Sequence, residues 1–73
     1  MTDIKIRIGK RIKELRNSLG ISQEQLGFKA ELDRTYITGV ESGKRNISIV
    51  ALEKIILALG SDLPTFFNSI ETK

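Results

Sequence analysis

The sequence contains no cysteine and no histidine among its 73 residues. Without cysteine there are no disulfides and no thiolate chemistry, and without histidine the imidazole base and the usual zinc ligand sets are missing. The carboxylates that remain, such as Glu14, Glu24 and Glu53, fall on different predicted helices and suggest no acid–base pair. The sequence therefore predicts a protein that is not an enzyme and uses no metal or other cofactor.

Long hydrophobic runs are also missing. The longest, Ile55 to Leu59, is far shorter than the roughly 20 residues that span a bilayer, so we expect no membrane association and a cytoplasmic location. A composition of 40% hydrophobic and 29% charged residues is typical of a globular rather than a disordered chain. Its length predicts a single domain over residues 1–73.

Charge is unevenly distributed. The formal net charge is +3, and 10 of the 12 basic side chains lie in residues 1–45. This asymmetry predicts an anionic partner for the first part of the chain and another role for the rest, although a mildly basic surface of an ordinary globular protein would look the same. Binding of a membrane surface by the basic residues Lys10, Lys13 and Arg16 is a weaker alternative, because no aromatic residue accompanies them.

Apolar spacing and capping residues predict five short helices and an all-α fold. Near the N-terminus apolar residues recur every three or four positions, at Ile4, Ile8, Ile12, Leu15 and Leu19. This pattern predicts a helix over 4–19 that Gly20 ends. Ser22, Asp33 and Ser48 can act as helix N-caps. Each follows an apolar residue that can pack against a second apolar residue five positions later, in a hydrophobic staple. These caps predict helices over 23–30, 34–41 and 49–59. Asp62 can cap a fifth helix, with Leu63 and Pro64 in its first turn.

Two short helices joined by a tight turn are typical of a helix-turn-helix, whose second helix enters the DNA major groove N-terminus first. The residues at the start of that helix are then the ones that reach base edges. Arg34 can donate two hydrogen bonds to guanine, Thr35 offers a hydroxyl and a methyl group, and Thr38 lies one turn later. We expect these three residues to read DNA bases.

Four segments of the sequence are similar to the lambda repressor and Cro family of helix-turn-helix regulators, also called the XRE family. They are Ile12-Lys13-Glu14-Leu15-Arg16, Gly20-Ile21-Ser22-Gln23-Glu24-Gln25-Leu26, Tyr36-Ile37 and Glu41-Ser42-Gly43-Lys44-Arg45-Asn46. Within the family the chain looks most like the controller proteins of restriction-modification systems. This resemblance is carried by Leu32-Asp33-Arg34-Thr35-Tyr36-Ile37, the loop Gly43-Lys44-Arg45-Asn46 and the closing Phe66-Phe67. The resemblance implies a five-helix, lambda-repressor-like domain that binds a palindromic operator in double-stranded DNA and autoregulates its own operon.

The resemblance also implies roles for individual residues. Those expected to contact the DNA backbone are Arg16, Ser22, Gln23, Tyr36, Lys44, Arg45 and Asn46. Arg16 is expected to pair with Glu41, and Glu24 matches the place where lambda-type repressors contact RNA polymerase. Tyr36 could equally belong to the core, and Arg45 could reach a base. Two departures from the family are Glu31, which must adopt a left-handed conformation in the turn, and Gly27, where many relatives have alanine.

A single recognition helix contacts too few base pairs for selective binding, so we expect a homodimer. Its two recognition helices should lie about 34 Å apart, which is one helical turn of DNA. The C-terminal part, about residues 61–73, is predicted to form the interface through Leu63, Phe66, Phe67 and Ile70. We expect some of these side chains to close the monomer core and others to form the interface. Phe28 could be core or lie exposed near the other subunit. Two dimers could also pair on DNA.

Two other functions fit the same residues. An antitoxin-type helix-turn-helix protein would bind a toxin as its main partner and use DNA binding for autorepression. A phage-type repressor would share the fold and the operator-binding mode. Co-purification with an unrelated chain would favour the antitoxin role.

Overall fold

The computed structural model describes residues 3–70, which fold into five α-helices and no strands. In chain order the helices are α1 (Ile4–Ser18), α2 (Gln23–Ala30), α3 (Arg34–Glu41), α4 (Ile49–Ala58) and α5 (Leu63–Ser69). The predicted bounds agree with these to within one residue, because Leu19 and Leu59 are the C-caps of α1 and α4 rather than their last helical residues. The all-α fold class is confirmed.

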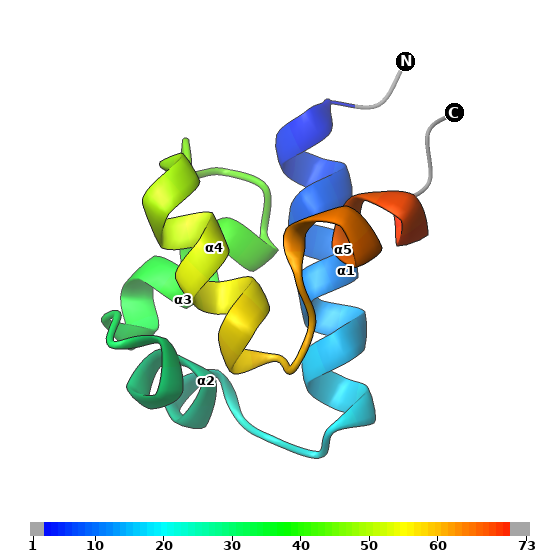
Figure 1. Cartoon of the computed structure of the whole chain (residues 1–73). Coiled ribbons are helices and arrows are strands. Elements are labelled where there is room, and N and C mark those ends of the chain that lie inside the picture. Colours follow the sequence, from blue (N-terminus) through cyan, green and yellow to red (C-terminus); the bar gives the residue numbers. More distant parts are fainter. Residues whose placement is uncertain (1–2, 71–73) are drawn as a thin grey trace.

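The helices pack around one another in a small bundle (Figure 1). Helix α2 packs against α3 and α4, α1 packs against α3, and α5 packs against α4. A hydrogen bond from Arg11 Nε to Ser69 Oγ, 2.9 Å long, joins α1 to the end of α5. Within residues 3–70 no helix is both long and apolar enough to cross a membrane.

Every helix contributes to one hydrophobic core. The side chains that are fully buried are Ile12, Leu26, Ile37, Ile55, Ile56 and Phe66. The residues just before the caps, Ile21, Leu32 and Ile47, are partly buried and pack against this core, which agrees with the predicted staples. Burial of these side chains is the main favourable contribution to folding in so short a chain.

The predicted N-caps are present. Ser22 Oγ accepts a hydrogen bond from the Gln25 amide N at 3.0 Å, and Gln25 Oε1 accepts one from the Ser22 amide N at 2.7 Å, so both halves of the capping box are formed. Ser48 caps α4 in the same position, through the amide N of Ala51. Asp33 caps α3 differently, because its carboxylate accepts from Thr35, the second residue of the helix rather than the third.

The turn between α2 and α3 departs from ordinary backbone geometry at one residue. Glu31 has φ of 59° and is the only residue other than glycine with a positive φ in the described part of the chain, as the sequence predicted. Beside it, a Cβ on Gly27 would lie 2.7 Å from the carbonyl O of Leu32, so glycine lets the turn fold closely onto α2. The conformation of this turn therefore determines the orientation of α3 relative to α2.

Two of the four residues predicted to form the dimer interface are core residues instead. Phe66 is fully buried and Ile70 is 6% exposed, so both side chains close the core of the single chain and have almost no surface left for a partner. Leu63 is partly buried against the same core, whereas Phe67 is 40% exposed. Residues 71–73 of the predicted interface segment lie outside the described residues.

Candidate nucleic-acid interface

Helix α3 presents one face to solvent and buries the other. Ile37 and Val40 point into the core, whereas Arg34, Thr35 and Thr38 are exposed. The structure therefore brings the three predicted base readers together on one surface. Arg34 forms no ion pair in residues 3–70, so its guanidinium can turn toward a ligand.

The carboxylate of Asp33 organises the first turn of α3. Asp33 Oδ1 accepts hydrogen bonds from the amide N of Thr35 at 2.7 Å and from Thr35 Oγ1 at 2.6 Å. These bonds hold the pKa of Asp33 below its usual value, with a smaller contribution from the nearby Arg34 charge. Because the hydroxyl proton of Thr35 is directed to Asp33, Thr35 has its methyl group and a lone pair to offer a base.

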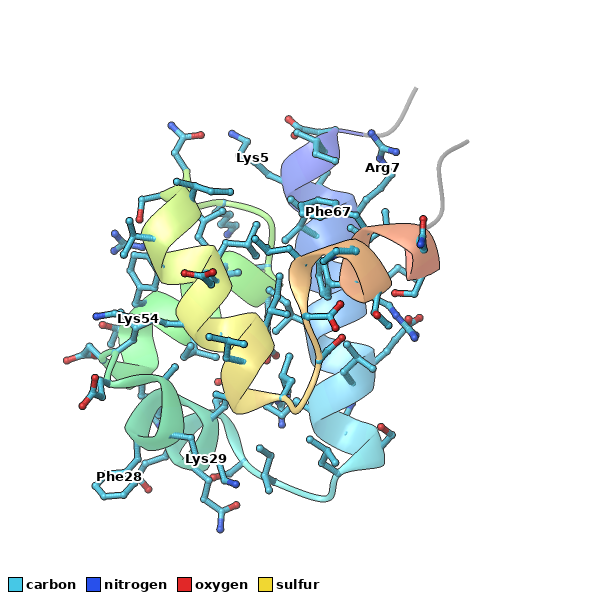
Figure 2. All side chains as sticks on the ribbon, viewed as in Figure 1. Lys5, Arg7, Phe28, Lys29, Lys54 and Phe67 are labelled. Carbon is cyan, nitrogen blue, oxygen red and sulfur yellow. The ribbon has the colours of Figure 1, made fainter. Side chains whose placement is uncertain are left out.

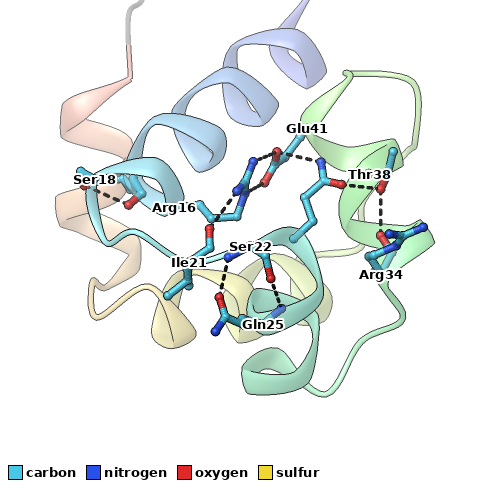
Figure 3. Close-up of polar contacts among 10 residues, drawn as sticks. Arg16, Ser18, Ile21, Ser22, Gln25, Arg34, Thr38 and Glu41 are labelled. Carbon is cyan, nitrogen blue, oxygen red and sulfur yellow. Dashed lines mark hydrogen bonds and ion pairs between the residues drawn. The ribbon is translucent and has the colours of Figure 1, made fainter.

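Arg16 and Glu41 form the predicted ion pair, which joins α1 to the end of α3 (Figure 3). Arg16 Nε and Nη2 donate to the two Glu41 carboxylate oxygens at 2.7 and 3.0 Å, and Arg16 Nη1 donates to the carbonyl O of Ile21 at 2.9 Å. The hydrogen bond to Glu41 raises the pKa of Arg16. The structural role of Arg16 is therefore confirmed, whereas a phosphate contact by Arg16 stays a prediction.

The same carboxylate binds the first residue of α2, a contact that the sequence did not predict. Gln23 Nε2 donates to Glu41 Oε1 at 3.1 Å, and Gln23 Oε1 accepts from Thr38 Oγ1 at 2.9 Å. Thr38 Oγ1 also lies 3.1 Å from the carbonyl O of Arg34 (Figure 3). Sequence spacing could not reveal this network because its members come from three different helices.

The N-terminus of α2 lies next to this network. Ser22 caps the helix through the Gln25 amide, which leaves the amide N–H groups of Gln23 and Glu24 at the helix end. Free N–H groups and the helix dipole favour an anion such as a DNA phosphate at such a position. Glu24 itself is exposed in the first turn of α2.

The loop after α3 folds back onto the recognition helix. The Arg45 guanidinium lies 4.5 Å from the centre of the Tyr36 ring, in a cation–π contact. A Cβ on Gly39 would lie 3.3 Å from Arg45 Cβ, so the absence of a side chain at 39 leaves room for the arginine. Tyr36 is half-buried against the core, while Lys44 and Asn46 are exposed. Tyr36 therefore packs on the core, as one interpretation of the sequence expected, whereas its contact with the DNA backbone stays a prediction.

The structure also exposes a set of apolar side chains that the sequence did not predict. Apolar residues at the starts of α1 and α4 are about half exposed or more, namely Ile4, Ile6, Ile49 and Val50. With Phe67 some of them line a groove of about 310 Å³. Phe28 is 86% exposed and projects from α2 at the opposite end of the molecule from Phe67, so Phe28 is not a core residue (Figure 2).

The sequence of this chain matches known regulators over most of its length. The helix-turn-helix family matches residues 12–66. Control protein C.MunI from Mycoplasma sp. is 49% identical over 72 residues, which are 97% of each chain. Control protein C.BamHI from Bacillus amyloliquefaciens is 42% identical over 59 residues, covering 80% of this chain and 73% of that protein.

Solved structures agree with the sequence matches. The restriction-modification controller protein C.AhdI from Aeromonas hydrophila superposes with a TM-score of 0.80 at 44% identity, over 85% of this chain and 92% of that one. The controller protein C.Esp1396I, solved as a tetramer in complex with its natural 35 base-pair operator, gives a TM-score of 0.86 at 37% identity, over 93% and 90% of the two chains. The chain belongs to the XRE-like helix-turn-helix family, in the group that includes the controller proteins of restriction-modification systems.

Proposed function

We propose that the protein is a sequence-specific transcriptional regulator that binds a palindromic operator in double-stranded DNA as a homodimer. The observation that carries this proposal is the exposed face of α3, where Arg34, Thr35 and Thr38 lie together beside the N-terminus of α2. A helix of this kind reads base edges in the major groove while the preceding helix holds the phosphate backbone. This role is one of binding and requires no catalytic residue.

In this proposal Arg34 and Thr35 face the bases, and Thr38 lies on the same exposed face of α3. Contacts with the DNA backbone come from Ser22, Gln23, Tyr36, Lys44, Arg45 and Asn46. Arg16 lies next to Gln23, because both side chains bind Glu41. The basic loop residues would position the reader, since phosphate contacts carry no sequence information of their own. DNA binding also implies a place in the cytoplasm of a prokaryotic cell, where the operator is.

The controller-protein role is favoured over that of a phage repressor by the extent of the matches. C.MunI and this chain cover 97% of each other. The immunity repressor of Bacillus phage phi105 aligns over 53 residues, which are only 37% of that repressor's length. We therefore propose autoregulation of a restriction-modification operon. An antitoxin role would require a toxin partner, and co-purification with an unrelated chain would support it.

The homodimer interface is proposed on the exposed apolar side chains at the starts of α1 and α4, together with Phe67. Ile49 and Val50 are 65% and 62% exposed, and apolar side chains in contiguous patches mark interaction surfaces. A second copy is the natural occupant because a two-fold interface is self-complementary. Compared with the interface predicted from the sequence, the proposed interface retains Phe67, includes Leu63 only at its edge and excludes the buried Phe66 and Ile70. It leaves α2 and α3 free for DNA.

The interface is tested with Val50→Glu, which places a charge among the exposed apolar side chains at the start of α4. We expect this variant to sediment as a monomer at concentrations where the wild type is a dimer. Phe28→Glu is the matched control, because Phe28 is exposed at the other end of the molecule and its replacement should leave the dimer intact. If Phe28→Glu dissociated the dimer and Val50→Glu did not, the interface would lie on α2 instead.

Contact with RNA polymerase through Glu24 is a further part of the proposal. Glu24 is exposed in the first turn of α2, so it stays accessible beside bound DNA. Replacement by Lys should abolish activation at full operator occupancy while DNA binding persists. Full activation by Glu24→Lys under those conditions would remove this part of the proposal.

The proposed function itself is tested by selecting binding sites from a random duplex library at about physiological salt, where non-specific contacts are weak. We expect a palindromic consensus with half-sites about one helical turn apart. The consensus should then be found upstream of the protein's own gene. Failure of the folded protein to enrich any sequence would contradict a role in sequence-specific regulation.

A further inference from the structure

The amide of Gln23 has only one orientation that satisfies its surroundings. On one side lies the Glu41 carboxylate, 3.1 Å from Gln23 Nε2, and a carboxylate can only accept hydrogen bonds. The amide nitrogen must therefore face Glu41, and the amide oxygen must face Thr38. Glu41 is in turn held by Arg16 at 2.7 and 3.0 Å, so this end of the amide cannot turn.

The hydroxyl of Thr38 fills the other side of the amide. Thr38 Oγ1 lies 2.9 Å from Gln23 Oε1 and 3.1 Å from the carbonyl O of Arg34, and both of these oxygens can only accept. A hydroxyl has one proton, so the proton of Thr38 is used within the protein. Thr38 consequently has no donor to offer a base, even though its side chain lies on the exposed face of α3.

The network leaves Gln23 with one unused donor. Its oxygen and one of its two amide N–H groups are bound, so the second N–H stays available at the start of α2. A glutamine that is already immobilised loses little freedom when it binds a phosphate. Fixing such a side chain only on binding would weaken association by roughly 2- to 10-fold per site.

We infer that Thr38 is a positioning residue rather than a base reader: its hydroxyl holds the Gln23 amide so that the remaining N–H meets a DNA phosphate. This inference rests on the proposed DNA-binding function. It predicts that the Thr38 hydroxyl contributes equally to binding of every DNA sequence, because a phosphate is present at every site.

Two substitutions separate positioning from base reading. Thr38→Val keeps the shape and the methyl group but removes the hydroxyl, whereas Thr38→Ser keeps the hydroxyl and removes the methyl group. Binding is measured on the selected operator, on its single base-pair variants and on a random duplex, over a series of salt concentrations. We expect Thr38→Val to weaken binding of the dimer to all duplexes by the same factor, roughly 4- to 100-fold because two sites each lose roughly 2- to 10-fold. We expect Thr38→Ser to rescue the loss.

Salt dependence and a double-mutant cycle add two readouts. Gln23 is neutral and displaces no counterion, so Thr38→Val should shift the plot of binding against salt without changing its slope. In a Gln23→Ala background Thr38→Val should have no further effect. An undiminished effect of Thr38→Val in that background would show that the hydroxyl acts without Gln23 and would overturn the inference.

Opposite behaviour of the two variants would also overturn it. If Thr38→Val bound like the wild type, and Thr38→Ser lost discrimination at a single base pair, the methyl group of Thr38 would be a thymine reader. If wild-type protein enriched no sequence, the proposed function would fail first and this inference with it. Binding by the wild type together with an unaffected Thr38→Val would refute the inference alone.

A measurement without DNA covers the case in which Thr38→Val does not fold. The side-chain amide resonances of Gln23 in a ¹H–¹⁵N spectrum report on its hydrogen bonds directly. They should shift toward free-glutamine values in Thr38→Ala, where alanine favours the helix, and stay in place in Thr38→Ser. Unchanged resonances in Thr38→Ala would mean that Thr38 does not hold the amide.

Discussion

The two ends of this small molecule are stabilised in different ways. At the α2–α3 end, polar side chains from three helices form the Arg16–Glu41–Gln23–Thr38 network, and charged groups remain exposed around it. At the opposite end, the starts of α1 and α4 and the residue Phe67 expose apolar side chains with no network among them. Polar networks fix geometry, whereas apolar patches supply affinity for a partner.

The difference indicates a division of labour. A reader of base edges must be held rigidly, because small displacements spoil hydrogen bonds of about 3 Å. A self-association surface needs mainly apolar area and shape. One hydrophobic core therefore supports both an end that is ordered by hydrogen bonds and an end that we propose is covered by a second copy of the chain.

The largest expected effect comes from the neighbouring aromatics Phe66 and Phe67, whose rings contact each other edge to face. Phe66→Ala removes a fully buried ring and should lower the free energy of unfolding by about 3–5 kcal/mol, enough to unfold much of so small a protein. Phe67→Ala should change stability far less and weaken the dimer instead. Urea unfolding at low protein concentration and sedimentation together check this; equal effects of the two variants on stability would contradict it.

Breaking the network at Glu41 should have the next largest effect. The Arg16 and Glu41 side chains are 10% and 3% exposed, so Glu41→Ala leaves a buried guanidinium without a counter-charge. We expect a loss of about 3 kcal/mol in the free energy of unfolding. The control is the double variant Arg16→Met/Glu41→Leu, which removes both charges and should be more stable than Glu41→Ala.

At the reading surface, Arg34→Ala should weaken operator binding by about 1–3 kcal/mol and relax discrimination at one position of each half-site. Arg11→Ala is the matched control, because Arg11 pairs with Glu14 on α1 and touches α5 rather than α3. Competition binding on operator variants measures both. Equal weakening of operator and random DNA by Arg34→Ala would rule out a base contact.

The loop that follows α3 should contribute affinity without specificity. Lys44 is exposed and has no ion pair in residues 3–70, and we expect its replacement by Ala to weaken all duplexes alike. The slope of log K against log salt should fall by roughly 1 per subunit, because one phosphate contact per subunit is lost. An unchanged slope would place Lys44 away from the DNA.

The smallest expected effect is on how stability depends on pH in acid. Hydrogen bonds from Thr35 lower the pKa of Asp33, so its charged form stabilises the folded state above the unfolded-state pKa, and this contribution is lost as pH falls through the folded-state pKa. Asp33→Asn keeps a capping oxygen but does not titrate. Its unfolding free energy should therefore vary less with pH below about 4 than that of the wild type. Identical pH profiles would show that Asp33 is not stabilised as a carboxylate.

Local sequence was sufficient for the helices. Caps at Ser22, Ser48 and Asp62 and the glycines at 20 and 60 lie within a few residues of the helix ends that they define, so the helix bounds followed to within one residue. The exposed face of α3 followed for the same reason. The helical period places Arg34, Thr35 and Thr38 opposite Ile37 and Val40.

Contacts between helices could not be derived in this way. The link from Gln23 to Thr38 spans 15 residues, and its existence depends on how the left-handed Glu31 sets α2 against α3. Likewise, the aromatic pair Phe66-Phe67 is apolar at both positions, and only packing against the core decides which ring is buried and which is left for a partner.

The sequence by itself determined the helices, their caps and the family, because each depends on residues that are close together along the chain. Only the tertiary structure decided that Phe66 and Ile70 belong to the core, that the apolar surface lies at the starts of α1 and α4, and that the Thr38 proton is already used. Burial and hydrogen-bond partners depend on distances in space between separate helices, which no local pattern specifies.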